Sequence, residues 1–128
     1  MTETEINKLA DTVRETAFQI HKYHKHGHLE KVYENALAHR LRKLGLQIAQ
    51  QFPITVYDED GAKLGLYYAD ILVEHQLIIE IKAASTLVDA HVAQVLGYLR
   101  SSRFEHGLLI NFGNARFQIR KLILQTID

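Results

Sequence analysis

The sequence contains no cysteine, a single proline and no long apolar run. Without cysteine, disulfides, thiolate zinc sites, iron–sulfur clusters and cysteine nucleophiles are excluded. Because no apolar stretch is long enough to cross a bilayer, no membrane partner is expected. The sequence also lacks an internal repeat and a low-complexity linker. Its 128 residues are therefore expected to form one domain, residues 1–128.

The chain carries no net charge, because 15 Lys and Arg residues balance 15 Asp and Glu residues. This balance excludes the coat-like binding of nucleic acid that strongly basic proteins show, but it is compatible with a basic patch on one face. Apolar residues make up 47% of the chain, which is enough for a hydrophobic core. The first residues, MTETE, are acidic and lack the apolar segment of a signal peptide, so a cytoplasmic location is expected.

Apolar residues recur at helical spacing through the first third of the chain, which predicts two helices. Gly27 is expected to stop the first helix and Gly45 the second, since glycine readily adopts the left-handed conformation after a helix. The first stripe consists of Ile6, Leu9, Ala10, Val13, Ala17 and Ile20, and the second of Leu29, Val32, Tyr33, Ala36, Leu37, Leu41 and Leu44.

Strands are predicted after residue 50, where the periodicity changes. Pro53 indicates that the first strand lies at an edge, and Asp60-Gly61 predicts a hairpin turn after it. A further helix is expected after Thr86, which with Asp89 resembles a capping box. The predicted strands cover residues 52–56, 64–73, 77–83, 106–112 and 117–124. The order α-α-β-β-β-α-β-β is typical of an α+β fold, a mixed α/β sandwich.

Charged residues interrupt two neighbouring strands that are otherwise apolar. Asp70 lies in the second predicted strand, and Glu80 and Lys82 share one face of the third. A three-residue loop over 74–76 would pair Val73 with Leu77 and place Asp70 opposite Glu80. A two-residue loop would put the two acids on opposite faces, and we expect the first register. The alternative interpretation is an ordinary hairpin with one solvated face.

Two carboxylates this close repel each other, so without a cation one of them should have a raised pKa. A divalent metal would remove the conflict, and a site made only of oxygen ligands suits Mg²⁺ or Mn²⁺ better than zinc. Lys82 beside such a site could stabilise developing negative charge or orient water. The chemistry that fits these residues is metal-assisted hydrolysis of a phosphodiester.

Two helices could complete this site. Glu30 heads the stripe formed by Tyr33, Leu37 and Leu41, so it faces either the core or, in the first helical turn, the solvent near the helix dipole. In the last predicted helix, His91, Gln94 and Tyr98 form a polar strip beside the apolar face. Such a strip either marks the solvent boundary or lines the site.

These residues carry a family resemblance. Asp70 followed by Glu80-Ile81-Lys82 resembles the signature of PD-(D/E)XK nucleases, with Ala69 in the place of the expected proline. Residues 27–33, GHLEKVY, are similar to the GxxExxY motif that names a family of small bacterial and archaeal proteins. Residues 93–99 contain a Q-x-x-x-Y pair, and residues 107–113 read GLLINFG. The resemblance extends over about residues 5–124.

The resemblance implies a restriction-endonuclease-like core, in which helices flank a mixed β-sheet. Asp70, Glu80 and the backbone carbonyl of Ile81 would then hold Mg²⁺ or Mn²⁺, with Glu30 completing the metal site. Lys82 would be the catalytic lysine. In this arrangement Gln94 and Tyr98 would hold DNA or orient the site, and His91 and Tyr33 would lie in the surrounding layer or contact the substrate.

Two hypotheses follow for function. The first is a metal-dependent nuclease that cleaves phosphodiester bonds, in DNA, through a metal-activated water. The alternative is a catalytically inactive protein with the same fold that serves as a nucleic-acid-binding or assembly module in a repair or defence complex. The histidine-rich segment 21–28 is expected to be a solvated basic helix end, with phosphate contact as its functional use. The apolar final hairpin predicts a homodimer through its edge.

Overall fold

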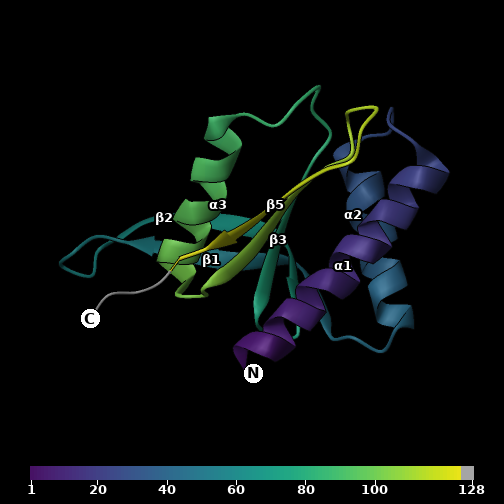
Figure 1. Cartoon of the computed structure of the whole chain (residues 1–128). Helices are drawn as coiled ribbons and strands as arrows, with labels where there is room; N and C mark the ends of the chain where they lie inside the picture. The colour runs from purple at the N-terminus through teal and green to yellow at the C-terminus, as the bar shows by residue number, and fades with distance from the viewer. Residues whose placement is uncertain (125–128) are drawn as a thin grey trace.

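A computed structural model describes residues 1–124, in which three helices and five strands follow one another (Figure 1). The observed order confirms the predicted α+β fold. Residues 125–128 of the predicted domain lie outside the described part. The elements are α1 (Glu3–His24), α2 (Glu30–Lys43), β1 (Ile48–Tyr57), β2 (Lys63–Val73), β3 (Leu77–Lys82), α3 (Asp89–Ser102), β4 (His106–Asn111) and β5 (Gln118–Ile123).

The five strands form one mixed sheet in the order β1-β2-β3-β4-β5. Only β3 and β4 are parallel within it, and α3 makes the crossover between them. Strand β1 lies at an edge of the sheet, as Pro53 indicated, because proline has no N–H to donate and is tolerated where a strand has no neighbour on one side. Among residues 1–124, no helix combines the length and hydrophobicity that a bilayer crossing requires.

Helices cover both faces of the sheet, so the fold has two apolar cores (Figure 1). Helices α1 and α2 pack on one face and α3 on the other. Strand β3 supplies both cores by alternation: Ile79 and Ile81 face α1 and α2, whereas Ile78 faces α3. Glu80 and Lys82 have the same parity as Ile78, which places them on the α3 face of the sheet.

Strand β1 changes faces at Gln51. Ile48 packs into the core under α1 and α2, whereas Phe52 and Ile54 pack into the core under α3. Residues separated by an even number normally share a face, so an irregular residue must intervene. Gln51 has a φ of 54°, in the left-handed region that a non-glycine residue seldom occupies. This residue therefore redirects the outer half of the β1–β2 hairpin toward α3.

The helix boundaries correct three sequence predictions. Helix α1 ends at His24 with a left-handed Lys25, two residues before Gly27. Helix α2 begins at Glu30, and Leu29 is 79% exposed because it lies outside the helix as its N-cap. Helix α3 begins at Asp89 without a Thr86 cap. The backbone N–H of Val88 instead donates to the Nδ1 atom of His91 over 3.1 Å.

The chain after β4 passes very close to the end of β3. The N–H of Phe112 donates to the carbonyl oxygen of Lys82 over 2.8 Å. A Cβ atom on Gly113 would lie 2.4 Å from both the carbonyl carbon of Ala83 and the carbonyl oxygen of Ala84. Glycine is therefore required here by a backbone-to-backbone approach, and that approach fixes the exit of the strand that carries Glu80 and Lys82.

Gly113→Ala is expected to lower the free energy of unfolding by about 1–3 kcal/mol, because the new methyl group meets backbone that cannot rotate away. Gly97→Ala is the matched control. It lies within α3 with nothing within 4 Å of the added carbon, so better helix propensity should raise stability by up to about 1 kcal/mol. Urea denaturation measures both, and equal effects of the two variants would contradict the packing argument.

Candidate active site

Asp70 and Glu80 meet on the adjacent strands β2 and β3. The ladder pairs Val73 with Leu77 and Ile71 with Ile79, which confirms the register expected from a three-residue loop. One step further along, the N–H of Asp70 donates to Oε1 of Glu80 over 3.3 Å, and the N–H of Ile81 donates to Oδ2 of Asp70 over 2.7 Å. At this step of the β2–β3 ladder, the two carboxylates therefore accept the hydrogen bonds that backbone carbonyl groups would otherwise accept.

The electrostatics of this pair are unfavourable for two negative charges. Glu80 is only 5% exposed, and burial together with the charge of Asp70 raises the pKa of its carboxyl to about 8. The Lys82 ammonium nitrogen lies 3.8 Å from Oε2 of Glu80 and offsets part of this rise. Burial also raises the pKa of Asp70, against the lowering effect of the hydrogen bond from Ile81. The pair therefore holds a proton under conditions where isolated carboxylates are ionised.

Glu30 lies next to this pair without joining it. Its Oε2 atom accepts a hydrogen bond from the N–H of Ala83 over 3.3 Å, just beyond Lys82. The Glu30 side of α2 thus adjoins the end of β3, while the residue itself is exposed. Within residues 1–124, no group of three or more His, Cys, Asp or Glu side chains is close enough together to hold a metal ion. The structure thus assembles two of the three predicted carboxylate ligands.

A second glutamate of α2, which the sequence reasoning missed, also lies near the pair. Glu34 is 4% exposed and forms an ion pair of 2.9 Å with Lys31. Its negative charge is one of the causes that raise the pKa of Asp70. One signal in the sequence could have revealed it: Glu34 follows Glu30 by four residues and therefore lies on the same side of the helix.

Gln51 connects Glu34 to Asp70. Its amide nitrogen donates to Oε1 of Glu34 over 2.8 Å and to Oδ1 of Asp70 over 3.4 Å. A left-handed backbone at a residue other than glycine costs on the order of 1 kcal/mol, and such strain persists only where surrounding contacts hold it. Here the hydrogen bonds to two acids supply those contacts, so Gln51 both turns β1 and orients the Asp70 carboxylate.

Helix α3 covers the pair with a hydrogen-bonded Gln94 and Tyr98. The Gln94 amide nitrogen donates to the Tyr98 hydroxyl oxygen over 3.0 Å. Tyr98 is 6% exposed, and burial together with the charges of Glu80 and Asp70 raises the pKa of its phenol to about 12. The Tyr98 hydroxyl is therefore within electrostatic reach of both acids, as a lining role for this strip of α3 requires.

The two other residues predicted around the site have structural contacts of their own. The His91 ring accepts the N–H of Val88 and so helps to begin α3. The Tyr33 ring stacks on Phe112 with a centroid distance of 4.6 Å, and its hydroxyl oxygen accepts the N–H of His28 over 3.1 Å. Tyr33 therefore holds the loop before α2 against the core.

The donor atoms at the pair fit a divalent metal. Asp70 and Glu80 supply carboxylate oxygens, and the Ile81 carbonyl belongs to the residue between Glu80 and Lys82. Oxygen ligands suit Mg²⁺ or Mn²⁺. A dication beside the two carboxylates would replace the shared proton and offset the repulsion that raises both pKa values.

A mixed sheet with helices on both faces, and an acid on one strand next to an E-x-K segment on its neighbour, define a nuclease-type domain. The chain belongs to the PD-(D/E)XK nuclease superfamily, whose family model matches residues 7–122. The solved crystal structure of SSO0001 aligns with 77% of this chain at 18% identity and a TM-score of 0.58, which shows a shared fold. This chain spans 50% of the length of SSO0001. No curated protein is a significant match.

The raised pKa of Glu80 predicts how stability depends on pH when no divalent cation is added. The folded chain keeps this proton up to about pH 8, whereas the unfolded chain releases it near the ordinary pKa of 4.5. The free energy of unfolding should therefore fall as pH rises between these values. Glu80→Gln removes the ionisable group and should reduce this fall by on the order of 1–3 kcal/mol.

Urea denaturation in EDTA at pH 5, 6.5 and 8 measures this dependence. Glu59→Gln, in the exposed turn between β1 and β2, is the matched control and should follow the unsubstituted chain. A fall in stability that is equally steep with and without the Glu80 carboxyl would contradict the assignment of the raised pKa.

Proposed function

We propose that this protein is a metal-dependent nuclease that hydrolyses phosphodiester bonds in DNA. The observation that carries the proposal is the Asp70–Glu80 pair on adjacent strands, with the Lys82 ammonium 3.8 Å from Glu80. A buried acid beside a half-buried one, both with raised pKa values, destabilises a fold when no ligand is bound, which makes the pair a functional-site candidate on physical grounds. Membership of the nuclease superfamily supports the same reaction class.

Each residue of the proposed centre has a distinct task. Asp70, Glu80 and the Ile81 carbonyl would hold Mg²⁺ or Mn²⁺, with Glu30 approaching from α2. Such an ion, when bound, lowers the pKa of water and offsets negative charge on the phosphate. Lys82, whose side chain is 17% exposed, keeps its donors at the border between the pair and the solvent. From there it can donate a hydrogen bond to the attacking water or to a phosphate oxygen.

One observation favours the alternative of an inactive binding or assembly module. The centre is closed in this structure, since Glu80 is 5% exposed and Tyr98 6% exposed. A phosphodiester can reach Glu80 only if the side chains that bury it move, so catalysis requires that this part of the centre opens. The module hypothesis needs no such opening. DNA cleavage that depends on Lys82 would favour the nuclease over the module.

Lys82→Ala is expected to reduce cleavage of DNA in Mg²⁺ or Mn²⁺ by about 100-fold or more, because it removes charge stabilisation at the reacting phosphate. Lys8→Ala, on the exposed side of α1, should retain the activity of the unsubstituted chain. The assay should compare single- and double-stranded DNA with RNA. Full activity of the Lys82→Ala variant would mean that cleavage occurs at a site other than the proposed centre. A parent protein that binds DNA without cutting it would support the binding or assembly module.

Further parts of this proposal concern the setting of the protein. A cytoplasmic location is part of this proposal. We also keep a homodimer through β5, which forms the second edge of the sheet opposite β1. Ile123 of this strand is 48% exposed, so the edge presents an apolar side chain beside its unpaired backbone.

A further inference from the structure

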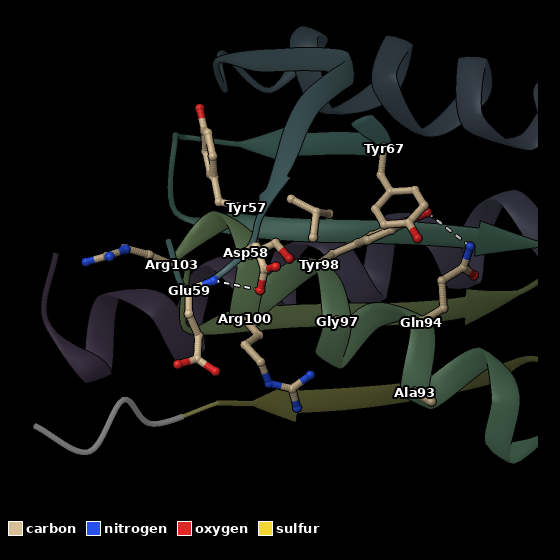
Figure 2. A pocket seen from close by; sticks show the side chains of 12 residues that line it. Tyr57, Asp58, Glu59, Tyr67, Ala93, Gln94, Gly97, Tyr98, Arg100 and Arg103 are labelled. Carbon is tan, nitrogen blue, oxygen red and sulfur yellow. Dashed lines mark hydrogen bonds between the residues drawn. The ribbon is translucent and has the colours of Figure 1, made fainter. Parts of the chain in front are cut away.

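A groove lies between the β1–β2 hairpin and α3, and Tyr98 and Gln94 form part of its wall. Its volume is about 810 Å³. Figure 2 shows Tyr67, Tyr98 and Gln94 at one end and Arg103, Asp58 and Glu59 at the other. The fold creates this groove because Gln51 turns the outer hairpin toward α3, while Gly97 adds no side chain to the wall.

The groove presents aromatic rings that the protein leaves uncovered. Tyr67 is 53% exposed, and its ring centroid lies 5.6 Å from that of the buried Tyr98. Tyr57, near the other end, is 57% exposed. Exposed tyrosines gathered in a concave site are typical of recognition surfaces, since their rings provide large, rigid contact area. A planar ring that stacks on Tyr67 would fill this end of the groove.

The charges along the groove favour a ligand that combines an uncharged planar ring with one negatively charged group. Arg100 and Arg103 line it, but so do the acids Asp58 and Glu59. These four formal charges cancel, so a whole phosphate backbone would gain little by lying along the groove. Within residues 1–124 neither arginine side chain forms an ion pair or hydrogen bond with the protein, which leaves both able to contact one phosphate.

The aromatic end of the groove lies close to the proposed catalytic centre. Tyr67, which lines the groove, precedes Asp70 by three residues on β2, and its ring centroid lies 5.6 Å from that of Tyr98. A nucleic-acid strand with its phosphodiester at the acid pair would therefore bring a neighbouring base to Tyr67. In a duplex the bases are stacked and paired, so only their edges are accessible in the grooves. An unpaired base can offer its face to an aromatic side chain.

We propose that this groove binds an unpaired base, and that the substrate is single-stranded nucleic acid or a single-stranded end. The base stacks on Tyr67, and Arg100 or Arg103 contacts a phosphate of the same strand. This inference rests on the proposed function, because it assigns the scissile phosphate to the Asp70–Glu80 pair. It adds a strand preference and a binding residue to that function.

Binding can be measured by fluorescence anisotropy with a labelled single-stranded oligonucleotide and a blunt duplex of the same sequence. The Lys82→Ala chain serves as the background, since it is expected not to cut the probe. Tyr67→Ala should weaken single-strand binding by about 5- to 150-fold, the range that loss of one base–aromatic stack produces. Tyr67→Phe keeps the ring and should retain the affinity.

Tyr68→Ala is the matched control, because Tyr68 adjoins Tyr67 in β2 and is similarly exposed, at 49%, yet lies outside the groove. It should leave single-strand binding unchanged. The proposal is overturned if the duplex binds as tightly as the single strand, or if both tyrosine-to-alanine variants lose equal affinity. It is also overturned if adding Tyr67→Ala to the Lys82→Ala chain leaves the affinity for the single strand unchanged.

Mn²⁺ binding separates failure of this inference from failure of the proposed function. A titration with Mn²⁺ alone tests the acid pair without placing a ring in the groove, so the Tyr67→Ala chain should keep the parent affinity for Mn²⁺. Loss of Mn²⁺ binding together with oligonucleotide binding would indicate a damaged centre and overturn the groove assignment. A parent protein that cleaves no DNA would refute the nuclease function, and the anisotropy result would still decide whether the groove binds an unpaired base.

Discussion

The structure is organised around the repulsion between Asp70 and Glu80. Two carboxylates on adjacent strands, one of them 5% exposed, cannot both be ionised in an apolar setting without a compensating charge. Lys82 provides part of that charge from 3.8 Å away, and a shared proton provides more. Natural proteins accept this kind of local instability where a ligand uses it. The proposal that this pair serves a cation rests on its cost in stability.

The neighbouring elements each hold one side of the pair in place. Gln51 adopts a left-handed backbone, bridges Glu34 and Asp70, and turns the hairpin toward α3. The close passage of Gly113 over Ala83 and Ala84 fixes the end of β3. Tyr98 covers the pair on the side of α3 and also lines the groove. The same irregular residue, Gln51, thus orients the Asp70 carboxylate and shapes the surface that would receive the neighbouring base.

The sequence predicted the order of the elements and the β2–β3 register, because alternation and a three-residue loop leave one pairing that buries the apolar residues. It predicted less well which side of α2 faces the core. Leu29 and Val32 were expected to be buried, but Leu29 precedes the helix and the packed face includes Glu34. Gln51 carried no signal, since a left-handed glutamine depends on tertiary hydrogen bonds. The place of Glu30 beside Ala83 likewise follows from how α2 docks on the sheet.

Calorimetric titration with Mn²⁺ at pH 7, in buffers of different ionisation enthalpy, tests the central claim most directly. Because Glu80 has a pKa of about 8 without metal, the pair should release about one proton for each ion bound. Glu80→Gln should abolish this release. Binding of Mn²⁺ without proton release, or no binding at millimolar Mn²⁺, would contradict the account.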